Sequence, residues 1–262
     1  MPEEIKKVLI VALEGVSGSD VYEAAKAGKL ANIRRLIGDG TVVPGVVVDA
    51  CAASSWATLA TGAHVATHGV TAAGQTSKAQ YIWQAAEKAS KRGLLLGLAA
   101  SALPAYHEDH PAELVSPANA DAAYFDRVGS YLLSSPDWDI AFVHVPAGSS
   151  LREADEAAGK ALDAADFETL RVLVAVPATE GDGLLVLEGP GVKRGKVVER
   201  PVELADVAPT ICTLAELPIP ADCEGGVIYQ AMDDPDGKLV ELQACRRNYE
   251  RLRRSSGSTP MC

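Results

Sequence analysis

KVLIVALEG, residues 7–15, decides the fold class of this chain. It is an uninterrupted apolar run that ends at a carboxylate and a glycine, which is typical of a strand buried on both faces of a sheet. Helical patterns separate it from similar apolar runs at 94–100, 140–145, 170–176 and 184–192. Strands that alternate with helices predict a three-layer αβα sandwich with a largely parallel central sheet.

The length and composition are those of one large α/β domain. The chain has 262 residues, of which 48% are hydrophobic and 23% are charged, so it can bury a substantial core. We expect this domain to cover residues 1–235, and residues 236–262 to form a C-terminal helix and a flexible tail.

Charge and cysteine content narrow the function classes. The formal net charge is −11, and without a concentrated basic face we expect no nucleic-acid binding. The five cysteines form no C-x-x-C pair, which indicates reduced thiols in the cytoplasm or another intracellular reducing compartment. The N-terminal apolar run is too short for a membrane span and has no signal-peptide pattern.

The region between residues 41 and 70 predicts a strand followed by a short helix. Pro44 lies inside the apolar run 41–49, so we expect an edge strand or a bulge there. In SSWATLATGAHVATHGV, residues 54–70, Ser54 or Ser55 can cap a helix that Gly62 ends.

Four regions, in this order, resemble the alkaline phosphatase superfamily, in particular its phosphodiesterase and nucleotide-pyrophosphatase branch, with sulfatases and cofactor-independent phosphoglycerate mutases as relatives. They are VLIVALEGV (8–16), LANIRRLIGDGT (30–41), the 54–70 segment, and LLVLEGPGVKRG with VELADVAPTICTLAELPIP (184–195 and 202–220). The resemblance runs from about residue 7 to residue 232. It implies an alkaline phosphatase-like core, here without the usual cap insertion.

The resemblance also implies a two-metal site and a Thr or Ser nucleophile at the start of a helix. The first-strand metal ligand of the family corresponds to Glu14, a carboxylate that is one methylene longer than the usual Asp. The nucleophile corresponds to Ala52, nine residues before Thr61. A methyl group cannot attack phosphorus, so the position of the nucleophile is vestigial.

The other family ligands are also replaced. The Ser-Asp-His-Gly motif corresponds to residues 178–181, so that Thr179 and Glu180 stand at metal positions. The Asp-x-x-x-His pair corresponds to PAGSS, residues 146–150, which contains neither ligand. Glu14 and Glu180 alone cannot make a closed zinc site, which needs about four ligands. One hydrated Mg²⁺ would accept one or two carboxylates.

Two neighbours of Ala52 carry reactive groups. A shift of register could recruit Cys51 or Ser54 as a nucleophile, but we favour ordinary roles for them, a small buried thiol and a helix-capping hydroxyl. His144 lies inside the apolar run 140–145, and we favour a core or edge histidine over a metal ligand.

The remaining histidines are also interpreted as structural or surface residues. Gly62 and Gly69 place His64 and His68 beyond the helix, and His68-Gly69 resembles a structural signature of the family that ends this loop. His107, Asp109 and His110 lie in a proline-containing segment, 101–118, which we expect to be a long surface loop.

Three hypotheses follow. The favoured one is a catalytically inactive pseudoenzyme without cofactor that binds a protein partner or joins a larger assembly, with the 101–118 loop and the arginine-bearing C-terminal helix as contact surfaces. The alternative is a divergent metal-dependent phosphohydrolase or phosphodiesterase that uses Glu14, Glu180 and either Ser54 or Cys51, with one or two Zn, Mn or Mg ions, on a small phosphate ester. A Rossmann-type nucleotide-binding protein ranks third, since no G-x-G-x-x-G motif follows the first strand. The sequence does not indicate a homo-oligomeric state.

Overall fold

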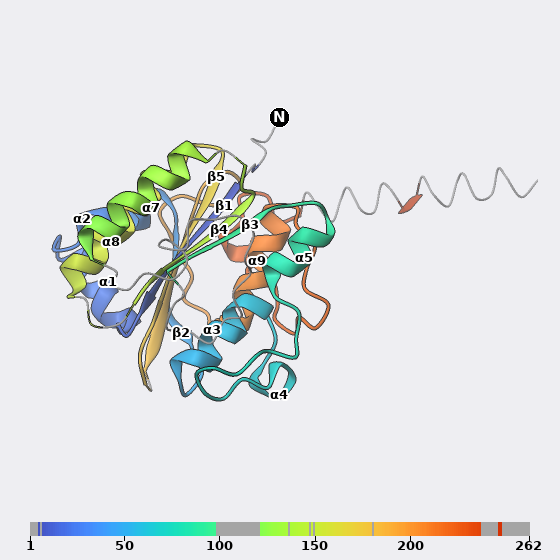
Figure 1. The fold of residues 1–262 in the computed structure, drawn as a ribbon. Helices are drawn as coiled ribbons and strands as arrows, with labels where there is room; N and C mark the ends of the chain where they lie inside the picture. Colours follow the sequence, from blue (N-terminus) through green and yellow to red (C-terminus); the bar gives the residue numbers. More distant parts are fainter. Residues whose placement is uncertain are drawn as a thin grey trace, which may run out of the picture.

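The centre of the molecule is a twisted seven-stranded sheet with the order β3-β4-β1-β5-β6-β2-β7 (Figure 1). The computed structural model describes residues 5, 7–97, 121–135, 137–146, 148, 150–179, 181–236 and 246–247. Within these residues the strands are β1 (Lys7–Glu14), β2 (Thr41–Val47), β3 (Gly93–Leu96), β4 (Ile140–Val145), β5 (Thr169–Val176), β6 (Asp182–Glu188) and β7 (Lys196–Val197).

The sheet is largely parallel, as the alternation of strands and helices predicts. β1 pairs in parallel with β4 and β5, and β3 pairs in parallel with β4. β6 is antiparallel to both of its neighbours, β5 and β2. The predicted irregularity at Pro44 is a bulge, because the register of β2 against β6 shifts between Pro44 and Val46.

Helices cover both faces of the sheet and make it the middle layer of three (Figure 1). One face packs against α3 (Ala52–Thr61), α5 (Ile82–Lys88) and α9 (Val207–Leu214). The other face packs against α1 (Gly18–Lys26), α2 (Ala31–Asp39), α7 (Ala122–Ser134) and α8 (Leu151–Leu162). The short α4 (Val65–His68) and the 3-10 turns Leu204–Asp206 and Tyr229–Ala231 complete the described elements. The predicted three-layer αβα sandwich is confirmed.

Strand β1 explains why its apolar run decides the fold. Its side chains alternate between the two faces, so that Ile10 contributes to the core under α3 and Leu9 to the core under α8. Residues Val8 to Leu13 are all almost fully buried. Burying a large aliphatic side chain contributes about 1.5–3 kcal/mol, and polar side chains on either face would remove that contribution.

Helix α3 begins earlier than the sequence predicts. Its first residue is Ala52 and its N-cap is Cys51, whereas Ser54 and Ser55 lie inside the helix and are buried. The predicted end is confirmed, because Gly62 takes the left-handed conformation (φ 68°) and its N–H donates to the Thr58 carbonyl.

No helix within the described ranges has the length and hydropathy that a membrane-spanning helix needs.

Candidate functional site

The residues that the family resemblance singles out meet at one edge of the sheet. Glu14 ends β1, Thr179 follows β5, and four residues separate the end of β2 from the start of α3. β1 and β5 are parallel neighbours, and β2 runs in the same direction because β6 is antiparallel to both β5 and β2. The three elements therefore contribute to the carboxyl edge, where ligands of open α/β sheets usually bind.

Glu14 is engaged by a histidine from the neighbouring strand. Its Oε2 lies 2.6 Å from Nε2 of His144 in β4, and the other ring nitrogen, Nδ1, lies 2.9 Å from the carbonyl oxygen of Gly97. The His144 side chain is 1% exposed, and the Glu14 side chain is 24% exposed. The carboxylate that resembles a family metal ligand thus has a buried protein partner.

Trp56 forms the wall beside this pair. Its indole ring meets His144 and Phe142 edge to face, with ring centroids 5.8 and 6.3 Å apart. The side chain is buried, and its Nε1–H has no hydrogen-bond partner within the described part of the chain. His144 is therefore a core histidine of an interior strand, as favoured, but one that bonds to the candidate site.

The nucleophile position holds only a methyl group. Ala52 is the first residue of α3 and packs partly buried against the core beneath it. Ser54 does not cap the helix, since its hydroxyl is buried and donates to the Cys51 carbonyl over 3.0 Å. The expected burial of Cys51 is also corrected, because its thiol is half-buried and lies 3.4 Å from both the Ser54 hydroxyl and the Thr71 carbonyl.

A second polar chain lies along the later part of α3. The N–H of Val70 donates to Nδ1 of His68 over 3.0 Å, so the hydrogen of the neutral ring is on Nε2. Nε2 then donates to the Thr58 hydroxyl over 3.0 Å, and that hydroxyl donates to Asp49. Each of the three hydrogens in this series of hydrogen bonds therefore has an assigned acceptor.

Burial explains the protonation state of His68. Its side chain is fully buried, and burial lowers the pKa of His68 below the ordinary value of 6.5. A proton on Nδ1 would also face the Val70 N–H, which already donates to that atom. The structural interpretation of His68 therefore agrees with the geometry.

His64 does not join His68. It is the N-cap of α4, its ring is about half exposed, and its Nε2 lies 3.7 Å from Glu203. Its backbone N–H donates to Glu224 over 2.8 Å. That hydrogen bond, together with one from Thr67, lowers the pKa of Glu224. The Glu224 carboxylate thus stabilises the turn after α3.

The described residues do not fit a two-metal site. Thr179 is exposed, and it supplies a hydroxyl in place of the family's carboxylate. Glu180, the 101–118 segment and its residues His107, Asp109 and His110 lie outside the described residues. Within the described part, no three His, Cys, Asp or Glu side chains are arranged to hold a metal ion. Glu14, which has the required chemistry, is bonded to His144.

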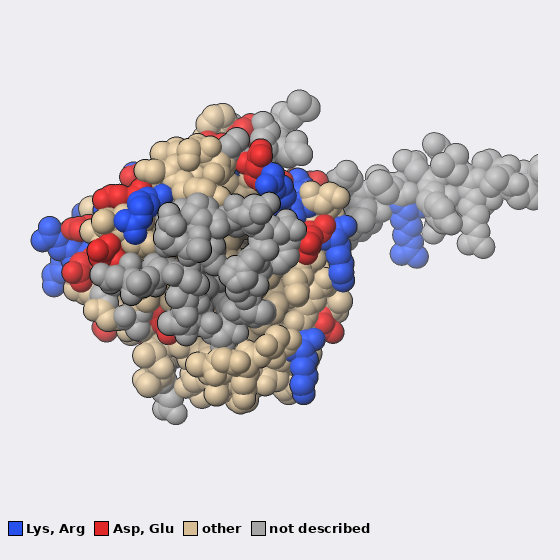
Figure 2. Space-filling view, in the orientation of Figure 1, with Lys and Arg blue, Asp and Glu red and all other residues tan. Residues whose placement is uncertain are grey.

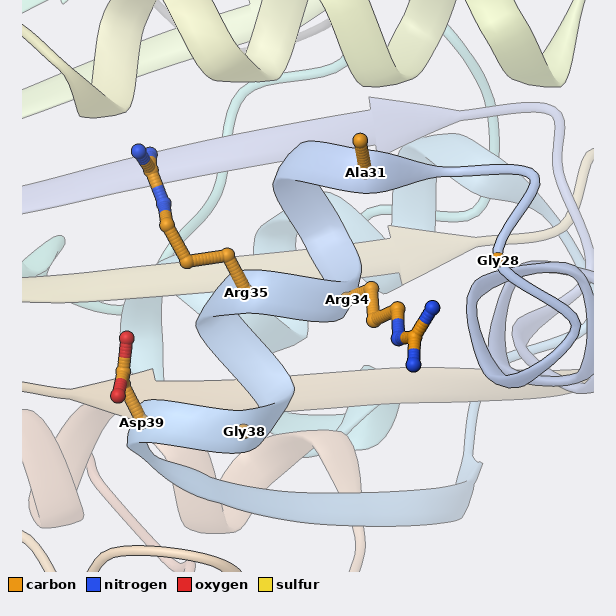
Figure 3. Close-up of a pocket in the computed structure, with 6 residues that line it drawn as sticks. All are labelled: Gly28, Ala31, Arg34, Arg35, Gly38 and Asp39. Atoms are coloured by element: carbon orange, nitrogen blue, oxygen red, sulfur yellow. The ribbon is translucent and has the colours of Figure 1, made fainter.

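A separate hollow of about 530 Å³ lies over α2 and the turn before it. Figure 3 shows that Arg34 extends toward Gly28, while Arg35 points away from it. Arg35 pairs with Asp163 over 2.6 Å. Since α2 leads into the start of β2, this hollow lies at the opposite end of the strands from Glu14. On the face drawn in Figure 2, described basic and acidic side chains are interspersed and form no continuous basic patch.

Comparison with known proteins identifies the fold. No protein-family model matches the sequence, and no curated protein matches it. Solved structures do match: the phosphonate monoester hydrolase SpPMH from Silicibacter pomeroyi has a TM-score of 0.60 at 17% identity, and the match covers 85% of this chain and 76% of that chain. The phosphonate monoester hydrolase of Agrobacterium radiobacter has a TM-score of 0.63 at 15% identity, with 87% and 76% covered.

A glycosaminoglycan sulfatase from Bacteroides thetaiotaomicron has a TM-score of 0.68 at 14% identity, and the match covers 88% of this chain and 77% of that chain. These neighbours are hydrolases of the alkaline phosphatase superfamily. The chain therefore has the alkaline phosphatase-like fold that the sequence motifs indicate.

The sequence alone did not reveal two parts of this region. It did not identify His144 as the partner of Glu14, nor Asp49 and Thr58 as the partners of His68. A signal was present, because a histidine inside an apolar strand needs a hydrogen-bond partner. Which partner it finds depends on which strands are neighbours in the sheet.

Proposed function

We propose that this chain is a catalytically inactive member of the alkaline phosphatase-like fold that serves a binding or structural role in an assembly. The observation that carries the proposal is the 2.6 Å bond between Glu14 and the buried His144. The bond occupies one of the two carboxylate oxygens with an imidazole of the same chain, and within the described residues no three His, Cys, Asp or Glu side chains are arranged to hold a divalent ion. Ala52 adds to this, because it offers no nucleophilic oxygen at the start of α3.

The role in an assembly is the part of the proposal that rests on the sequence. The chemical positions hold Ala, Thr and Gly, whereas the strands, helix ends and turns of the fold are present. Such a chain retains a large folded surface without the metal chemistry of its fold. The surfaces proposed for a protein partner are residues 101–118 and the arginine-bearing C-terminal segment.

Metal content and turnover test the proposal. The purified full chain is incubated with Zn²⁺, Mn²⁺ or Mg²⁺, desalted and examined by elemental analysis. It is then assayed with an aryl phosphate, an aryl phosphodiester, an aryl phosphonate monoester and an aryl sulfate, beside the Glu14→Ala variant. We expect much less than one metal ion per chain, and rates equal to those of the variant. About two ions per chain, or turnover that Glu14→Ala abolishes, would establish the divergent hydrolase instead.

The variant Ala52→Thr is the matched control for the nucleophile position. It places a hydroxyl on the first residue of α3, where the family resemblance puts the attacking oxygen. We expect no gain in turnover, because a hydroxyl is a weak nucleophile unless a metal ion or a base lowers its pKa. A gain that depends on added metal would show that only the nucleophile is missing, which contradicts the proposal.

A further inference from the structure

The Glu14–His144 pair connects three neighbouring strands of the sheet. The pair joins three strand ends, because Glu14 ends β1, His144 lies in β4, and Gly97 directly follows β3. His144 is buried and packed against Trp56. A buried imidazole that is bonded at both nitrogens is a built structural feature, since an unpaired polar group at this depth would be costly.

The hydrogen atoms of the pair can be assigned from its acceptors. The Gly97 carbonyl can only accept, so Nδ1 of His144 carries a hydrogen and donates it. The 2.6 Å contact between Nε2 and Glu14 then needs one further hydrogen. Whether nitrogen or oxygen holds it, the charges of the two side chains sum to zero. The carboxyl group at the end of β1 is therefore neutralised from within the chain.

The length of Glu14 fits this partner. His144 is in register with Ala12 of β1, so Glu14 lies two residues further along, about 7 Å of strand. The Glu14 carboxylate and Nε2 of His144 meet across this offset. An aspartate, which the family resemblance expects here, is shorter by about 1.5 Å. The 2.6 Å contact would open to roughly 4 Å, which is beyond hydrogen-bonding distance.

We propose that His144 replaces the metal ion as the partner of the Glu14 carboxylate. The hydrogen bonds that join Glu14, His144 and Gly97 then hold the C-terminal ends of β1, β4 and β3 together without any divalent cation. The extra methylene of Glu14 gives the carboxylate its reach, and the imidazole of His144 supplies the hydrogen bond that replaces the metal contact. The inference rests on the proposed absence of two-metal chemistry and explains how the fold remains stable without it.

The relative stabilities of two conservative variants of Glu14 test whether His144 replaces the metal ion. Glu14→Gln keeps the length and can donate its amide hydrogen to Nε2, whereas Glu14→Asp keeps the charge and loses the reach. In urea unfolding of the full chain with EDTA, we expect Glu14→Asp to lower the folding equilibrium constant about tenfold and Glu14→Gln to lower it less. When the unfolding is repeated with Zn²⁺ in place of EDTA, a metal-ligand role for Glu14 predicts the reverse order, because aspartate binds cations and glutamine binds them poorly. Equal stability of Glu14→Asp and the wild type would overturn the replacement.

A double-mutant cycle locates the effect in the pair. Glu14→Asp, His144→Gln and the combined variant are compared, and we expect the loss in the combined variant to be clearly smaller than the product of the single losses. Independent losses would contradict the proposal. Glu23→Gln, which removes the exposed pair with Lys26, serves as the control and is expected to change little.

Two further measurements keep the outcomes distinct. In the native wild type, the hydrogen between Glu14 and His144 should give a proton resonance far downfield of the amides, and it should be absent in Glu14→Asp even if that variant is only weakly folded. Its absence in the wild type would contradict the pair itself. If Zn²⁺ instead stabilises the wild type and not Glu14→Gln, the proposed function fails. If Zn²⁺ has no effect but the variants are as stable as the wild type, only the replacement fails.

Discussion

The two ends of helix α3 (Ala52–Thr61) meet different requirements. At its start the helix has a methyl group at Ala52 and no side-chain cap. At its end Gly62 turns the chain in the left-handed conformation, and Thr58 and His68 complete a buried hydrogen-bond chain. The end of the helix has the groups that packing and hydrogen bonding require, whereas the start carries a methyl group where the family resemblance places a nucleophile.

This difference separates two kinds of constraint on one helix. A turn after a helix fails if its glycine or its buried donors are changed, whatever the protein does. A nucleophile at the start of the helix matters only for a reaction. Changes at the start of α3 should therefore cost little stability, and changes near its end should cost more. The predictions below test the end of the helix, in order of decreasing effect.

The largest effect is expected for Gly62→Ala. A Cβ at this position would lie 2.5 Å from Sγ of Cys223 and 3.3 Å from the Ala205 carbonyl, and the left-handed backbone is itself unfavourable for alanine. Overpacking and backbone strain together should lower the free energy of unfolding by about 3 kcal/mol. Urea unfolding measures this loss.

Gly74→Ala is the matched control, because Gly74 is also left-handed (φ 82°) but would place its Cβ in open space. Only the backbone contribution of about 1 kcal/mol should remain. Equal losses in the two variants would show that packing against Cys223 is not a constraint on the end of α3.

Thr58→Val should have the next largest effect. It removes the hydroxyl between His68 and Asp49 while the side-chain shape is kept, so the buried Nε2–H of His68 loses its acceptor. We expect a loss of about 2 kcal/mol in the free energy of unfolding. Thr58→Ser keeps the hydroxyl and should retain most of the stability; if it loses as much as Thr58→Val, the missing methyl packing rather than the hydrogen bonds accounts for the change.

The smallest effect is a pH dependence from His68. Burial lowers its pKa in the folded chain, with His64 adding to this and the Asp49 and Glu224 carboxylates opposing it. The unfolded chain binds a proton near pH 6.5, where the folded His68 does not. The stability that neutral His68 contributes is therefore present above pH 6.5 and decreases as the pH falls below it, with a slope of at most about 1.4 kcal/mol per pH unit.

Unfolding free energies at pH 7.5 and 5.5, compared between the wild type and His68→Gln, measure this contribution. The decrease between the two pH values should be smaller in His68→Gln, since glutamine does not titrate. An identical decrease in both chains would assign the pH dependence to other groups.

Much of the fold could be predicted from local patterns. The apolar run of β1, the glycine that ends α3 and the proline bulge in β2 each result from forces that act within a few residues, such as burial on two faces or backbone sterics. The predicted N-cap of α3 was wrong by three or four residues. Ser54 and Ser55 are good capping residues, yet the Ser54 hydroxyl donates to the Cys51 carbonyl and the Ser55 hydroxyl accepts from the Asp49 N–H. Both side chains are also buried in the folded chain, which a capping pattern does not reveal.

Local sequence patterns are sufficient for the fold class and for the absence of a nucleophilic oxygen at Ala52, because apolar periodicity and the chemistry of a methyl group do not depend on distant residues. The hydrogen-bond partner of Glu14, in contrast, follows from the arrangement of the strands in space. Its partner His144 is 130 residues away, and the two meet because β1 and β4 are neighbours in the sheet. Strand order depends on the packing of all the layers together, so it also decides whether a carboxylate at a strand end stays free for a cation or bonds to the chain itself.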